Sequence, residues 1–535
     1  MVGVAVWAAS FRLNALDSVR LHMDALHPYI GALQITEGIH FPWRGVGSDF
    51  RFGALHAWLS VPLVAFADTS EQVLTRNGVL HALGVFPLAW AGWRCSGWGT
   101  AFFAGSCYAA WPILVSHPIH GAYSYQAPVF IAFAIAFAVE ATLQPNRRWL
   151  VATFIALAGA VSLHPIALPI AIGAAISLFL FRTLYQISDI QWAVGAGLVC
   201  VSPWLIDNLL LVAERAEAGI NATPQDPSMA HQSVVSLMHD ALSQTISGWP
   251  SWTLVICLLA PLSAAVLLAT KPWRGPESSP AQTGSKLFST WTVLALIGLF
   301  LFVGLLDYVQ PYHWAVWLPL CFLLMPMNIG LLTRRWLGSK AGPAGILFGL
   351  LSSLWMLTTT QGQLVHLTFA GPPNVEQRGV IHAASKAVSE QSQGATRTFA
   401  VLTDATGNTR GEPIALFFEQ WLSGEGDDNF PTTWKADGPQ AFVLASLSTA
   451  QWAAWGNPAV PVPWSTPSGP GQQIRLLAFP STVEAATWLS IGCALKTRWP
   501  TLLVQGPQEG LGGLKGARDG ADPRLIEWAR LCAAE

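Results

Sequence analysis

Charged and aromatic side chains gather in one stretch near the start of this chain, between Arg12 and Phe66, and long apolar segments surround it. Its carboxylates and guanidinium groups belong to Asp17, Asp24, Glu37, Asp49, Arg12, Arg20, Arg44 and Arg51. Ionisable groups close to a bilayer are costly, so their presence there usually indicates a function. This stretch is therefore the first place to look for chemistry.

Two kinds of chemistry are open to these side chains, and each has a structural alternative. Asp24 could take a proton from a hydroxyl group as a general base, or it could cap the helix that follows it. Arg44 and Arg51 could bind a phosphate through paired hydrogen bonds, or they could form salt bridges with Asp49 or Glu37. The neighbouring His27 is typical of a structural histidine.

The composition indicates a membrane protein. Of the 535 residues, 52% are hydrophobic and only 11% are charged, whereas soluble domains carry about 25% charged residues. The 26 tryptophans are typical of the aromatic belts at membrane interfaces. The net charge of −2 and the absence of a basic tract give no sign of a nucleic-acid partner.

The elements that must position the charged stretch are about eleven or twelve apolar segments, most of them near the length that crosses the hydrocarbon core. They lie at about 1–11, 53–66, 76–93, 99–116, 126–143, 149–163, 166–181, 190–206, 251–270, 287–306, 314–333 and 343–361. Segment 53–66 is short and could lie in the interface or begin a bent span. The pattern predicts a polytopic α-helical membrane protein with a multi-span domain over residues 1–362.

Basic residues in the connections predict the orientation of the chain. Alternate connections carry Arg94, Arg147, Arg148, Arg182, Lys271, Arg274, Lys286, Arg334, Arg335 and Lys340. By the positive-inside rule these connections are cytoplasmic. The large loops 12–75 and 207–250, the connection 307–313 and the chain beyond 362 are then external.

From residue 363 the composition changes, and no later segment could span a membrane. Residues 398–403, 441–445 and 474–479 are predicted strands, and 413–422, 449–455 and 482–496 are predicted helices between them. This alternation predicts that residues 363–535 form a soluble external α/β domain. The Gly-rich stretch 506–522 is interpreted as a flexible surface loop.

The order of residues in the charged stretch resembles the first external loop of the GT-C-type glycosyltransferases, polytopic membrane enzymes that include protein O-mannosyltransferases and aminoarabinose transferases. Arg12-Leu13 matches the step that ends the family's first membrane helix. Asp24 matches its acidic residue, Tyr29 its tyrosine, and Glu37-Gly38 the end of its amphipathic helix. One departure is that Ala25 follows Asp24, so the family's acidic pair is reduced to one carboxylate.

The resemblance implies an inverting glycosyltransferase of the bacterial inner membrane with its active site on the periplasmic face. It would move a sugar from a polyprenyl-phosphate carrier to a hydroxyl of a lipid, glycan or protein acceptor, with Asp24 as general base. The expected substrate-binding residues are Glu37, Arg44, Arg51, Asp49, His27, Tyr312 and His313. No cofactor or divalent metal is expected, because a metal usually needs several oxygen ligands. The alternatives are a transporter and a non-catalytic scaffold that presents the external domain.

Overall fold

The computed structural model of this chain describes residues 1–18, 23–38, 41–43, 53–116, 126–217, 251–269, 280–306, 315–337, 341–363, 375–392, 397–404, 418–419, 422, 440–467, 472–480, 482–495, 498–499 and 502–505. The chain divides into two compact units. The first comprises Met1–Ser18, Pro42–Trp58 and Thr75–Gly371, and the second comprises Val19–Phe41, Leu59–Leu74 and Pro372–Glu535. Two N-terminal segments thus group with the C-terminal residues, and the sequence-based division into 1–362 and 363–535 stays a prediction.

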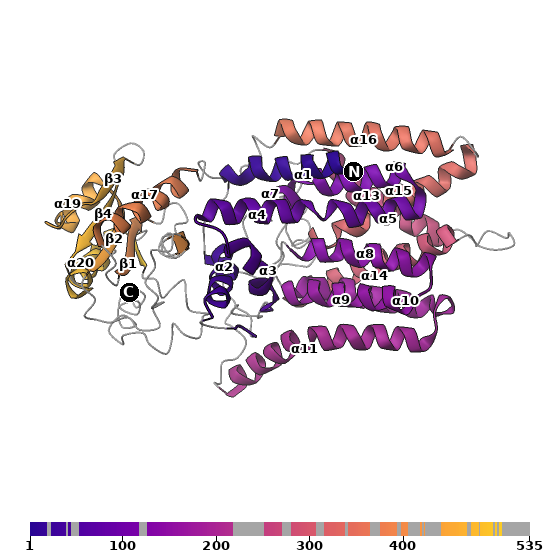
Figure 1. Ribbon diagram of the computed structural model, residues 1–535, viewed down its shortest axis with the longest axis horizontal. Coiled ribbons are helices and arrows are strands. Elements are labelled where there is room, and N and C mark those ends of the chain that lie inside the picture. Colours follow the sequence, from indigo (N-terminus) through magenta and orange to yellow (C-terminus); the bar gives the residue numbers. More distant parts are fainter. Residues whose placement is uncertain are drawn as a thin grey trace. The chain divides into compact units, whose positions relative to one another are not determined.

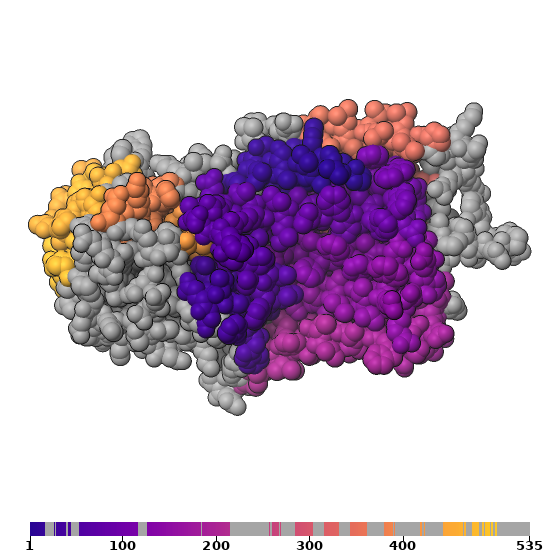
Figure 2. All heavy atoms as spheres, in the orientation of Figure 1, coloured from indigo at the N-terminus to yellow at the C-terminus, as the bar shows by residue number. Residues whose placement is uncertain are grey.

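Helices form over the apolar segments that the sequence predicts. They are α1 (Val2–Asn14), α3 (Leu55–Val64), α4 (Ser70–Ala82), α5 (Val85–Ser96), α6 (Trp98–Ala110), α7 (Pro112–Ser116), α8 (Ala127–Leu143), α9 (Arg147–Leu163), α10 (Leu168–Leu180), α11 (Ile187–Glu217), α13 (Ser251–Ala269), α14 (Pro280–Leu306), α15 (Leu318–Leu337) and α16 (Ala341–Gln363). Short 3₁₀ turns are η1 (Ala15–Ser18), η4 (Pro165–Ala167) and η5 (Arg182–Leu184). Figure 1 shows α8, α9, α10 and α11 running side by side, and their side chains contribute to a continuous surface in Figure 2.

Length and hydropathy of these helices fit a bilayer. Among the described residues, Ile187–Ala213, Gly284–Phe302 and Pro343–Thr360 are long and apolar enough to cross a membrane, and several shorter helices are also apolar. Large apolar side chains point outward from α11 and α16, including Val199 at 72% exposure and Leu347 at 59%. Helices with such apolar outer surfaces are stable in the hydrocarbon core of a membrane. The chain is therefore a polytopic helical membrane protein, as predicted.

Two predicted spans are each broken into two helices. Segment 76–93 is divided between α4 and α5 near Gly84, where a Cβ atom would collide with the ring of Tyr108. Segment 99–116 breaks at Trp111, whose backbone is extended, because a residue before proline avoids the helical region and Pro112 follows it. Segment 53–66 forms only the ten residues of α3, about 15 Å at the usual helical rise, which favours the interfacial alternative.

A buried arginine joins α1 to the end of α6. Arg12 is fully buried, and its Nη1 donates to the carbonyl oxygens of Ala8 at 2.9 Å and Ala109 at 3.3 Å. Its Nη2 donates to the carbonyl oxygen of Tyr108 at 3.4 Å. The last carbonyl groups of a helix lack partners within the helix and carry partial negative charge. Arg12 therefore supplies hydrogen bonds and positive charge to the C-terminus of α6.

The second unit contains a five-stranded sheet in the order β3-β4-β2-β1-β5. The strands are β1 (Arg397–Asp404), β2 (Gln440–Ser448), β3 (Trp464–Pro467), β4 (Gln472–Phe479) and β5 (Leu502–Gln505). Strands β1 and β2 are parallel, and the other neighbouring pairs are antiparallel. The predicted strands 398–403, 441–445 and 474–479 are confirmed as β1, β2 and β4, whereas the short strands β3 and β5 were not predicted.

Helices cover both faces of this sheet (Figure 1). On one face, α19 (Thr449–Trp455) and α20 (Thr482–Ala494) bring Trp452, Trp455 and Leu489 against alternate residues of β2 and β4. On the other face, α17 (Val375–Ser392) packs through Val380, Ala384 and Val388. The result is a small three-layer α/β arrangement, as predicted. The predicted helix 413–422 and the Gly-rich stretch 506–522 lie mostly or entirely outside the described residues.

Candidate functional site

Helix α2 (Met23–Thr36) carries the residue that the sequence places at the centre of the chemistry. Asp24 lies in its first turn, where a negative charge is favoured by the helix dipole. The helix ends just before Gly38, whose φ of +70° is in the left-handed region that favours glycine. The amide groups of Glu37 and Gly38 donate to the carbonyl oxygens of Leu33 at 3.0 Å and Ile35 at 3.1 Å. The predicted helix with a glycine end is therefore confirmed.

Tyr29 anchors α2 within the second unit. Its ring is 1% exposed and stacks on Phe418 with ring centroids 6.0 Å apart and planes inclined by 28°. The phenol oxygen has no hydrogen-bond partner in the described part of the chain. Burial raises the pKa of Tyr29 above its ordinary value, so the phenol stays protonated at neutral pH. This contact holds α2 in place five residues beyond Asp24.

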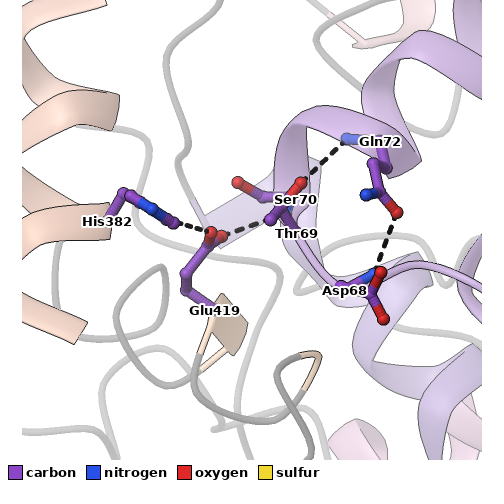
Figure 3. Close-up of polar contacts among 6 residues, drawn as sticks. All are labelled: Asp68, Thr69, Ser70, Gln72, His382 and Glu419. Atoms are coloured by element: carbon purple, nitrogen blue, oxygen red, sulfur yellow. Dashed lines mark hydrogen bonds and ion pairs between the residues drawn. The ribbon is translucent and has the colours of Figure 1, made fainter. Parts of the chain in front are cut away.

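Glu419, the residue after Phe418, connects two further elements of the same unit (Figure 3). Its side chain is 5% exposed. One carboxylate oxygen, Oε2, accepts the backbone N–H of Ser70 at 3.0 Å, at the start of α4. The other, Oε1, lies 3.1 Å from Nδ1 of His382 on α17. The carboxylate therefore satisfies a helix N-terminus and orients an imidazole at the same time.

The chain before α4 reinforces this arrangement. The amide of Asp68 donates to Oε1 of Gln72 at 3.0 Å, and the amide of Gln72 donates to Oγ1 of Thr69 at 3.3 Å. Figure 3 shows these bonds around the same helix start. With the first amide groups of α4 engaged, the position of Ser70 against Glu419 is well determined.

Chemically, Glu419 and His382 form a carboxylate–imidazole pair with one exposed member. The side chain of His382 is 63% exposed, and a carboxylate at one ring nitrogen favours the tautomer with its proton there. Sequence reasoning missed both residues. The available signal was a single carboxylate in the apolar run ALFFEQWL, because a carboxylate among apolar residues needs a partner.

The structure describes some of the predicted site residues. Asp24 and His27 lie on α2, and Glu37 follows that helix and is exposed. The remaining predicted binding residues, Arg44, Asp49, Arg51, Tyr312 and His313, lie outside the described residues. Their grouping around Asp24 stays a prediction.

His164 has a local structural role. It precedes Pro165 between two apolar helices, and its Nδ1 accepts the N–H of Ile166 at 3.2 Å. The side chain therefore caps the 3₁₀ turn η4. No group of three or more metal-ligating side chains occurs among the described residues, and the metal-free mechanism stays an expectation.

Comparisons with known proteins concern the fold. No protein-family model and no curated protein matches the chain. The chain is similar to the crystal structure of ArnT from Cupriavidus metallidurans bound to undecaprenyl phosphate, with 16% identity, a TM-score of 0.46, and coverage of 89% of this chain and 97% of ArnT. It is also similar to the Archaeoglobus fulgidus oligosaccharyltransferase in complex with Zn and sulfate, with 14% identity, a TM-score of 0.40, and coverage of 72% and 55%.

A third similar structure is the archaeal oligosaccharyltransferase AglB from Archaeoglobus fulgidus in complex with an inhibitory peptide and a dolichol-phosphate. It has 11% identity and a TM-score of 0.32, and the match covers 72% of this chain and 58% of AglB. The class that fold and composition define is a polytopic helical membrane protein with an α/β unit.

Proposed function

We propose that this protein is a membrane glycosyltransferase that moves a sugar from a polyprenyl-phosphate carrier to an acceptor hydroxyl on the external, periplasmic face of the bacterial inner membrane. The acceptor oxygen attacks the anomeric carbon and forms the new glycosidic bond. The bond from that carbon to the phosphate oxygen breaks, and polyprenyl phosphate leaves with the electron pair. Asp24 takes the acceptor proton. One displacement from the side opposite the phosphate inverts the anomeric centre.

The observation that carries this proposal is the structure of α2. Asp24 stands in the first turn of a short helix that closely follows the apolar helix α1. Tyr29 packs on Phe418 from within this helix, and the Gly38 turn follows its last residue. A general base must be held within hydrogen-bond reach of the hydroxyl it serves, and an anchored helix is the kind of support that the proposed base would need.

In the same proposal, Arg44 and Arg51 hold the carrier phosphate, since a guanidinium matches two phosphate oxygens at once. Positive charge there stabilises the departing phosphate as its negative charge develops. Asp49, Glu37, His27, Tyr312 and His313 complete the substrate-binding residues. The reaction uses no metal, because the single carboxylate at position 24 is too small a ligand set for a divalent ion.

The decisive experiment is Asp24→Asn in the full chain, purified in detergent and assayed with labelled polyprenyl-phosphate sugars. Asparagine keeps the shape and the capping ability of aspartate but cannot take the proton. Activity should fall by about two to four orders of magnitude, while the protein still inserts and migrates as the wild type does in gel filtration.

Asp68→Asn is the matched control, since Asp68 is exposed and has no part in the proposed reaction. It should retain wild-type turnover. A fully active Asp24→Asn enzyme would show that Asp24 is not the general base and would remove it from the mechanism. Activity of that variant restored by millimolar Mn²⁺ would contradict the metal-free reaction.

A further inference from the structure

An aromatic groove lies within the first unit, among helices α5, α6, α8 and α9. Its cavity volume is about 790 Å³, within the roughly 300–1,000 Å³ of pockets that hold small molecules. The aromatic rings of its wall belong to Phe86, Trp90, Trp93, Trp98, Phe133, Phe137 and Trp149. Several of these rings are open to the outside, with Trp90 and Trp98 each 49% exposed. The groove is therefore accessible and almost wholly apolar.

One ion pair interrupts this apolar wall. Glu140 lines the groove, and Arg94 donates to it twice, from Nε to Oε1 at 2.6 Å and from Nη2 to Oε2 at 3.0 Å. The indole N–H of Trp90 also donates to Oε1, at 2.9 Å. The carboxylate is thus fully neutralised, and the pair holds the Trp90 ring in its place on the wall.

The charge beside the groove is positive after these pairs are counted. At the start of α9, Arg147 is paired with Asp189 at 2.7 Å. Arg148 is exposed, and it directly precedes Trp149 of the groove wall. Among these three arginines, Arg94 and Arg147 are each paired with one carboxylate, and the exposed Arg148 adds positive charge. All three arginines lie in connections predicted to be cytoplasmic.

We propose that this groove binds one membrane phospholipid with an anionic headgroup. A hydrocarbon chain lies against the aromatic rings, and the phosphate lies beside Arg148. Three features select this occupant: the wall is apolar and open, the exposed Arg148 directly precedes Trp149 of the wall, and several indole rings flank connections predicted to be cytoplasmic, where tryptophan favours the boundary between acyl chains and headgroups. The site is independent of the proposed glycosyl transfer, because its wall contains none of the residues assigned to that reaction.

Native mass spectrometry of the full chain in detergent tests this proposal, with titration of dioleoylphosphatidylglycerol and dioleoylphosphatidylcholine as probes. The wild type should hold one phosphatidylglycerol molecule about tenfold more tightly than phosphatidylcholine. Ala136 lines the groove and is 6% exposed, so Ala136→Phe should fill the space and abolish this bound lipid. Trp98→Ala should weaken lipid binding. Because the Trp98 ring is half exposed, this change should leave the stability of the protein core unaffected.

Arg148→Gln should keep lipid binding but remove the preference for the anionic headgroup. Ile172→Phe is the control, because Ile172 is an exposed apolar residue of α10 outside the groove wall, and it should bind lipid as the wild type does. Unchanged binding in both Ala136→Phe and Trp98→Ala would overturn the proposal. Equal affinity for the two lipids in the wild type would overturn it as well. A dimer that Ala136→Phe dissociates would show that a second copy of the chain fills the groove instead.

Discussion

At the scale of single residues, Glu419 shows how one buried carboxylate can join segments that lie far apart in the sequence. Its partner Ser70 is 349 residues away, and His382 comes from a helix on the sheet. A carboxylate in such a site is stable only with both oxygens hydrogen-bonded. The contacts of Glu419 meet that requirement through one backbone amide and one imidazole.

Glu419→Ala should therefore destabilise the protein by about 1–3 kcal/mol, because the buried amide of Ser70 loses its acceptor. The unfolding midpoint in detergent, followed by circular dichroism, measures this loss. Glu390→Gln is the matched control, since Glu390 pairs with Lys386 at 4.0 Å and both side chains are about 70% exposed, and exposed pairs contribute little. Equal midpoints for Glu419→Ala and the wild type would show that the carboxylate does not support the fold.

The guanidinium groups of Arg44 and Arg51 should matter for donor binding more than for folding. Replacement of either by alanine should raise the KM for the polyprenyl-phosphate sugar or abolish turnover, with unchanged expression. Lysine should restore activity poorly, because it lacks the planar fork that matches phosphate. Steady-state kinetics across donor concentrations measures this effect, and wild-type kinetics in both alanine variants would exclude these residues from the site.

At the scale of elements, the start of α3 is held against the end of α9 by a close backbone contact. The N–H of Gly53 donates to the carbonyl oxygen of Ser162 at 2.6 Å. A Cβ atom at position 53 would lie 2.5 Å from that oxygen, which no side chain tolerates. Only glycine therefore permits this approach of the two segments.

Gly53→Ala should destabilise the helical unit by about 1–3 kcal/mol, the usual range for overpacking. Gly195→Ala is its control, because a Cβ atom at that position of α11 meets nothing within 4 Å, and alanine has the higher helix propensity. Thermal unfolding in detergent should show a lower midpoint for the first variant and an equal or higher one for the second. A midpoint for Gly53→Ala that matches the control would mean that α3 can shift away from Ser162 at no cost.

At the scale of the whole molecule, the arginine-rich connections predict that the α/β unit is external. A cysteine at position 392, introduced into a chain without its other cysteines, should react with a membrane-impermeant maleimide added from outside. The reason is that the predicted number of crossings and the positive-inside rule both place residues beyond 362 on that face. A cysteine at position 147, in a connection predicted to be cytoplasmic, should react only after the membrane is opened. The reverse pattern would invert the topology and with it the face of the proposed reaction.

The sequence by itself determined the membrane class, the helices over its apolar segments, the end of α2 at Gly38 and the strands β1, β2 and β4. These features depend on hydropathy, on proline and glycine conformation and on short-range periodicity, all of which neighbouring residues carry. The spacing of Val380, Ala384 and Val388 would also have indicated α17, because it repeats every four residues.

Only the tertiary structure decided which segments meet. The pairing of Glu419 with Ser70 and His382, the stack of Tyr29 on Phe418, and the aromatic groove around Trp90 all bring together residues from separate elements. The residues next to each partner in the sequence do not indicate these contacts, because the path of the chain between the partners decides which segments meet. The break at Trp111 is marked in the sequence by the proline that follows it. The close packing of the Tyr108 ring at Gly84, by contrast, is visible only in the tertiary structure.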